Sequence, residues 1–192
     1  MRKRFNLFQI LGFVLLISGL GLLLYSQIRT GTGMHTASEV VVQIEGILPR
    51  RTQGIRDTYT DMDMPSLQIG NEDFCALLEI PDYGVTLPVY NRWEPEKRAF
   101  YPCRFDGTCY DGSLIIGGAD QPGQLDFCGR IQTETRVTVT DMTGEVFHYS
   151  VSRIDRSRSA EAEKLAREAA DLVLFVRDSQ TLDYLIVSCV MA

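Results

Sequence analysis

The chain has 192 residues, which is enough for one domain of ordinary size together with an extension. Hydrophobic residues make up 45% of it and charged residues 23%, so a packed globular core is expected. The net charge is −6, and three of the 19 basic residues lie in the first 26 positions, which leaves 16 basic against 25 acidic residues in the remainder. This balance argues against a nucleic-acid partner, because displacing counterions from phosphates requires a basic surface.

Residues 7–25 predict a membrane-spanning helix. The stretch LFQILGFVLLISGLGLLLY has nineteen residues, no charge and one Gln, and at ~1.5 Å rise per residue it nearly spans a hydrocarbon core of ~30 Å. The basic flank MRKR places the N-terminus in the cytoplasm. A cleaved signal peptide is the alternative, but its apolar stretch is usually shorter, and no A-x-A site follows here. We therefore expect residues 1–26 to form a basic tip and an uncleaved single-pass anchor in the cell membrane.

Residues 27–72 are expected to form a stalk between the anchor and the domain. Apolar residues recur at helical spacing within it, which predicts a short amphipathic helix over residues 39–48. The apolar positions of this helix are Val40, Val41, Ile44 and Leu48. The polar segment that follows has no sustained period and is predicted to be a solvated linker.

From residue 73 onward the pattern indicates many short strands. RVTVTD and EVFHYSVSRI alternate polar and apolar residues, and the short connection between them predicts a hairpin. One helix is expected over residues 160–170, with Ser159 as its N-cap. Strands are expected at 75–80, 84–90, 113–118, 136–141, 145–154, 171–176 and 182–190. Many strands with few helices favour a mainly β fold, a closed β-barrel with one or two short helices over residues 73–192.

The five cysteines do not form a recognisable metal site. They are Cys75, Cys103, Cys109, Cys128 and Cys189, none spaced C-x-x-C, and the chain has only two His. We therefore expect no structural zinc, no other metal and no cofactor. An odd number leaves at least one thiol free or paired between chains. Cys103 and Cys109 are close enough in sequence to close a small disulfide loop, and independent free thiols are the other interpretation.

Several segments in this region resemble the sortases, the cysteine transpeptidases that join surface proteins to the bacterial cell wall. FCALLEIPDYGVTLPVYN resembles the opening segment of the family, and RVTVTDMTGEVFHYSV resembles its middle hairpin. SLIIGGAD resembles the segment with the acid/base His, ADLVLFVRD the segment with the nucleophilic Cys, and LDYLIVSC the segment with the Arg that holds the oxyanion or the substrate. The resemblance covers residues 73–192 and implies a class B-like, membrane-anchored barrel at the envelope of a Gram-positive bacterium.

The resemblance also implies where the catalytic residues would lie, and this chain has other residues there. The His position falls on Ala119, the Cys position on Arg177 and the Arg position on Tyr184. Acyl transfer needs a nucleophile, a proton shuttle and an oxyanion donor, and a guanidinium is not a nucleophile at physiological pH. No catalytic residues are therefore expected at these positions. Cys128 and His148 are the candidate pair that would substitute for the missing nucleophile and base. The other interpretation is that Cys128 is an ordinary packing residue and that His148 faces solvent on a strand.

These patterns predict a pseudoenzyme, a non-catalytic membrane protein with an extracytoplasmic sortase-like domain. Its expected partners are the membrane and a sorting-signal peptide, a pilin-like surface protein or an intact sortase. The alternative is an active cysteine transpeptidase that attaches proteins to the cell wall through a non-standard site, with Cys128 as the first candidate nucleophile. A third possibility is a decayed copy with no role, which predicts poor folding.

Overall fold

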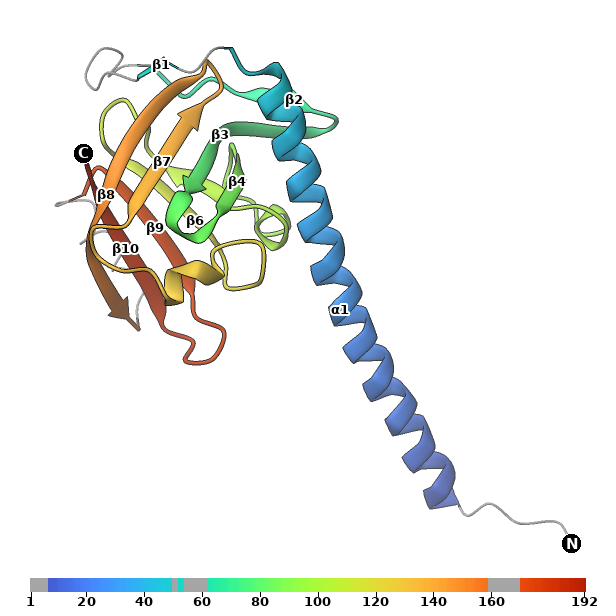
Figure 1. Ribbon diagram of the computed structural model, residues 1–192. Coiled ribbons are helices and arrows are strands. Elements are labelled where there is room, and N and C mark those ends of the chain that lie inside the picture. The colour runs from blue at the N-terminus through green and yellow to red at the C-terminus, as the bar shows by residue number, and fades with distance from the viewer. Residues whose placement is uncertain (1–6, 50–51, 54–61, 159–169) are drawn as a thin grey trace, which may run out of the picture. The chain divides into compact units, whose positions relative to one another are not determined.

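The computed structural model describes residues 7–49, 52–53, 62–158 and 170–192 (Figure 1). The chain divides into two compact units, Met1–Thr32 and Gly33–Ala192. Helix α1, Leu7–Ile47, begins in the first unit and ends in the second. Within the described part of the chain, no helix is both long enough and apolar enough to cross a membrane.

A closed barrel of eight strands forms the body of the second unit (Figure 1). Neighbouring strands follow the order β8, β10, β9, β6, β5, β4, β3, and β7 closes the ring by pairing with both β3 and β8. The strands are β3 Glu72–Ile80, β4 Val85–Tyr90, β5 Cys103–Asp106, β6 Leu114–Ala119, β7 Arg136–Asp141, β8 Glu145–Ser157, β9 Leu172–Arg177 and β10 Tyr184–Met191. The predicted fold class, a mainly β closed barrel, is confirmed.

In the described part of the chain, three short 3-10 helices connect the strands. They are η1 Pro81–Tyr83, η2 Lys97–Ala99 and η3 Asp126–Gly129. The helix predicted over residues 160–170 lies outside the described residues, except for Ala170, which is not helical.

Apolar side chains fill the barrel interior, as the alternation of the strands predicts. Phe147 and Tyr149 of β8 point inward and are almost fully buried, while His148 between them is exposed. Strands β6 and β9 are different, because most of their residues are buried on both faces of the sheet. Both strands therefore read as continuous apolar runs, and their outer face must be covered by other parts of the chain.

The C-terminal half of α1 packs against the outside of the barrel within the Gly33–Ala192 unit. Ala37, Val40, Val41 and Ile44 are buried at the spacing of one helix face, and Ile44 has no exposed surface. They form a cluster with Phe74, Leu77, Tyr90, Tyr101 and Cys103, called here the helix-side cluster. The short amphipathic helix predicted from the sequence is therefore the last part of a much longer helix.

The segment predicted to be a linker contributes two short strands to the sheet. β1, Thr52–Gln53, pairs in parallel with the start of β8, and β2, Leu67–Ile69, pairs with β3. Backbone hydrogen bonds to neighbouring strands hold these short strands in place. Because their position does not depend on a sustained apolar period, the sequence pattern did not predict them.

Candidate functional site

The three positions that the resemblance assigns to catalysis lie side by side in the sheet. Ala119 ends β6, Arg177 ends β9 and Tyr184 begins β10, and the register pairs Ala119 with Arg177 and Arg177 with Tyr184. Directly paired residues on neighbouring strands place their side chains on the same face of the sheet. The barrel therefore brings these positions together as one row, called here the end row, which holds a methyl group, a guanidinium and a phenol.

Arg177 is part of the β9–β10 turn. Its side chain is exposed, and its Nε donates a hydrogen bond to the carbonyl of Leu182 at 3.2 Å. Leu182 has φ +62°, a left-handed conformation that is uncommon for a residue with a side chain. The guanidinium therefore stabilises the β9–β10 turn, in which Leu182 has a strained backbone conformation.

The same turn is fastened by two carboxylates. Asp178 accepts hydrogen bonds from the backbone N–H groups of Thr181 and Gln180 at 3.0 and 2.8 Å, and it pairs with Arg156 at 2.9 Å. The Thr181 N–H and the Arg156 guanidinium hold the pKa of Asp178 well below its usual range. Asp120, next to Ala119, accepts from the N–H and hydroxyl of Ser179 at 2.9 and 2.8 Å. The ends of β6 and β9 are thus tied together beside the end row.

An aromatic cluster covers the sheet one row away from the end row. Gly117 of β6 pairs with Phe175 of β9, and both lie on the same face as Ala119 and Arg177. Trp93 and Phe105 pack against Phe175 with ring centroids 5.4 and 5.5 Å from it and 5.1 Å from each other. These three rings, Trp93, Phe105 and Phe175, are called here the aromatic cluster.

Gly117 provides the space that the aromatic cluster occupies. A Cβ atom at this position would lie 2.4 Å from Cζ of Phe175 and 2.6 Å from Cζ3 of Trp93. Neither separation is sterically possible, so any larger residue would displace a ring. From the sequence alone, Gly117 is only a residue near the end of the strand expected at 113–118.

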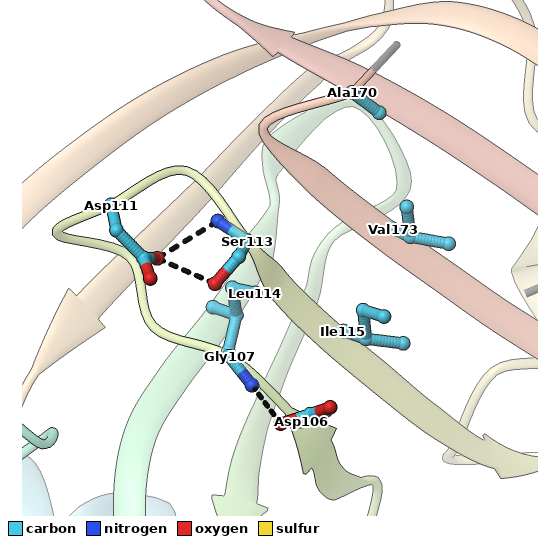
Figure 2. Close-up of a pocket in the computed structure, with 8 residues that line it drawn as sticks. All are labelled: Asp106, Gly107, Asp111, Ser113, Leu114, Ile115, Ala170 and Val173. Atoms are coloured by element: carbon cyan, nitrogen blue, oxygen red, sulfur yellow. Dashed lines mark hydrogen bonds between the residues drawn. The ribbon is translucent and has the colours of Figure 1, made fainter. Parts of the chain in front are cut away.

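A pocket of about 310 Å³ opens on the same face beyond the aromatic cluster (Figure 2). Its floor contains Ile115 and Val173, which pair across β6 and β9 and share the orientation of Gly117 and Phe175. Figure 2 shows that the loop bearing Asp111 and Ser113 forms one side, with Ala170 near the opposite strand. The face thus has three successive parts: the pocket, the aromatic cluster and the end row.

Acceptor groups line the polar side of this pocket. The Asp111 carboxylate accepts from the N–H and hydroxyl of Ser113 at 3.0 and 2.6 Å and from the Thr108 hydroxyl at 2.9 Å. Burial alone would raise the pKa of Asp111, but these hydrogen bonds outweigh it and lower the pKa below its usual value. Asp111 is therefore ionised at neutral pH and gives the pocket a negative edge against an apolar floor.

The substitute pair proposed from the sequence is not brought together. Cys128 lies in η3 and is buried in the barrel interior near Cys189 of β10. His148 points outward from β8, where its Nδ1 lies 3.4 Å from the hydroxyl of Thr138. The wall of the barrel separates the thiol from the imidazole.

All five cysteines are free and buried, so Cys103 and Cys109 do not form the disulfide considered above. Cys103 belongs to the helix-side cluster, whereas Cys109 points into the barrel interior. Burial raises the pKa of the Cys103 thiol to about 11 and those of Cys75 and Cys189 to about 12, and it raises the pKa values of Cys109 and Cys128 as well. None of these thiols is exposed or ionised as a nucleophile would be.

No family model and no curated protein matches this chain, but solved structures do. Sortase A from Corynebacterium diphtheriae, in a lid mutant, is similar with a TM-score of 0.57 and 16% identity, covering 87% of this chain and 95% of that one. Sortase C-3 from Streptococcus pneumoniae has a TM-score of 0.54 at 16% identity, and the match covers 85% of this chain and 82% of that one. A sortase D5 transpeptidase from Clostridium perfringens has a TM-score of 0.52 at 15% identity, and the match covers 62% of this chain and 79% of that one.

The barrel therefore has the sortase fold. Within that fold, Ala119, Arg177 and Tyr184 occupy the end row.

Proposed function

We propose that this protein is a non-catalytic sortase-fold protein of the cell envelope, which binds a segment of a surface protein or of a partner sortase. The observation that carries the proposal is the end row, because Ala119, Arg177 and Tyr184 offer neither the thiol nor the imidazole that cysteine transpeptidation uses. The buried cysteines add to it, since no thiol is available to form a thioacyl intermediate. In other hydrolases, loss of the nucleophile or its base costs about a millionfold in turnover.

The binding site that we propose is the pocket of Figure 2 and the face that continues from it. An apolar side chain of the ligand would rest on Ile115 and Val173, and a basic or donor group beside it would meet the carboxylate of Asp111. This chemistry favours an extended peptide segment that carries an apolar residue next to a positive charge. Val173→Arg would fill the pocket and is expected to weaken peptide binding at least about tenfold.

The test uses the full chain in detergent, a fluorescent LPxTG-type sorting-signal peptide and an amine acceptor. We expect saturable binding and no ligation, with the sortase D5 transpeptidase and its own substrate as the positive control. Thr138→Arg, on the outer surface of β7 and away from the pocket, is the matched control for Val173→Arg and is expected to bind like the unaltered protein. Ligation that is blocked by a thiol reagent and abolished by Cys128→Ala would establish the alternative, an active transpeptidase.

We further propose that residues 7–25 anchor the protein in the cell membrane, with the N-terminus in the cytoplasm and the barrel outside. The support is the uncharged apolar sequence of this stretch and its basic flank. A protease added to intact protoplasts is expected to remove the barrel and leave a membrane-bound N-terminal fragment. Full protection of the barrel, or its release into the medium without protease, would contradict this arrangement.

A further inference from the structure

The segment that carries Trp93 crosses the outer face of the barrel between β4 and β5. This segment, residues 91–100, is called here the strap. Its first residue is held by Asp73, whose backbone carbonyl and carboxylate accept from the backbone and side-chain N–H groups of Asn91 at 2.8 and 2.9 Å. Lys97 adds an ion pair with Glu72 at 2.5 Å. Both anchors lie at β3, so the strap is secured on the side away from the pocket.

The loop after β6 holds the other end of the strap. Gln121 donates to the carbonyl of Ala99 at 2.7 Å, and Gln124 donates to the carbonyl of Arg98 at 3.2 Å. Gln124 also accepts from the N–H of Ala119 at 3.1 Å, which links the strap to the end row. Between these two sets of hydrogen bonds, the strap contacts the barrel through Trp93, whose ring packs against Phe105 and Phe175.

Trp93 borders open space on one side of its ring. It is half-buried, and the guanidinium carbon of Arg98 lies 5.0 Å from its ring centroid in a cation–π contact. A second pocket, of about 410 Å³, borders Trp93 and Phe105 on the side toward Arg104. The ring therefore has open space beside it, and the contacts that a movement would break are those with Phe105, Phe175 and Arg98.

We propose that Trp93 is a gate that closes the middle of the peptide-binding face in the free protein. This inference rests on the proposed function. Successive residues on one face of a strand are ~6.6 Å apart, so the pocket at Ile115 and the end row at Ala119 lie ~13 Å apart along β6. An extended peptide that reaches from one to the other must pass over Gly117, where Trp93 and Phe175 now lie. The peptide occupies the whole face only after Trp93 moves away.

Trp93 is the only tryptophan in the chain, so its fluorescence reports directly on the gate. Arg98→Ala removes the cation–π contact and leaves the aromatic cluster intact. In the free variant, we expect acrylamide to quench Trp93 about twofold more efficiently than in the unaltered protein. Because a closed gate reduces the apparent affinity by the fraction of open molecules, the variant is also expected to bind the LPxTG-type peptide about three- to tenfold more tightly.

Arg136→Ala serves as the matched control, since Arg136 is an exposed arginine on β7 with one weak ion pair to Asp82 at 4.0 Å. It is expected to leave both quenching and affinity unchanged. Equal quenching of Trp93 in the free Arg98→Ala and unaltered proteins would overturn the gate, as would peptide binding that leaves the Trp93 emission unchanged. Increased quenching in the variant without peptide binding by either protein would overturn the proposed function instead, while supporting the closed position of Trp93.

Discussion

Replacement of Asp141 by alanine is expected to lower the free energy of unfolding by about 3–5 kcal/mol. Asp141 has no exposed surface and ends β7 at the turn into β8. Its Oδ1 accepts from the N–H groups of Thr143 and Glu145, each at 2.9 Å, and from the Thr143 hydroxyl at 2.7 Å. Its Oδ2 accepts from the hydroxyl of Tyr110 at 2.6 Å. Alanine would remove the acceptor for all four donors, three of which belong to the turn between β7 and β8.

One effect acts in the opposite direction. Burial, and then the charge of Asp141, raise the pKa of Glu145, so removing Asp141 relieves part of an unfavourable interaction between the two carboxylates. Glu145 is only partly buried, so this gain is expected to be small beside the loss of four hydrogen bonds.

Urea unfolding followed by circular dichroism would measure the change, with Asp141→Asn as the matched variant. Asparagine has the same shape and keeps an acceptor for the turn, so it is expected to cost about 1–2 kcal/mol. If alanine and asparagine had the same small effect, below about 1 kcal/mol, the carboxylate would not organise the turn in this way.

Gly117→Ala is expected to disrupt the aromatic cluster. The added methyl group would overlap Phe175 and Trp93, so at least one ring must move, and overpacking of this kind costs about 1–3 kcal/mol. The same displacement should expose Trp93, which predicts an emission maximum at longer wavelength and stronger quenching by acrylamide. Stability and fluorescence can be recorded on the same samples during urea unfolding.

Gly129→Ala is the matched control for this substitution. A Cβ at Gly129 would meet no atom within 4 Å, and its φ is not in the left-handed range. The control is therefore expected to retain its Trp93 emission and to change stability by less than about 1 kcal/mol. Two alanine variants with the same emission and the same stability would show that Gly117 is not needed for the packing of the rings.

Much of the barrel could be predicted from the sequence because its strands have strong local patterns. The hairpin of β7 and β8 was evident from the alternation of apolar residues and the short turn, and the buried face of α1 from the spacing of Val40, Val41 and Ile44. The three residues of the end row could be singled out because the segments that contain Ala119, Arg177 and Tyr184 resemble sortase segments that occur in the same order. The register of the sheet pairs Ala119 with Arg177 and Arg177 with Tyr184.

The remaining features depend on contacts that no local pattern reveals. Trp93 lies in an irregular segment, and its partners Phe105 and Phe175 come from strands far apart in the sequence. β5 was not predicted because it has only four residues, among them Arg104 and Asp106. Asp141 resembles an ordinary exposed turn residue, although it is fully buried. In each case tertiary packing determines the role of the residue, and local propensity does not record it.

The packing of α1 on the barrel has a consequence for the order of events during synthesis. The helix leaves the ribosome before any strand of the barrel, yet the buried side chains that cluster with Ile44 come from residues as late as Cys103. At ~5–20 residues per second, the nascent helix waits for several seconds with its apolar face uncovered. During that interval the exposed apolar face, formed by Val40, Val41 and Ile44, is prone to aggregation. Binding of this face by a chaperone or by the translocation machinery would protect the chain until β3 and β4 emerge.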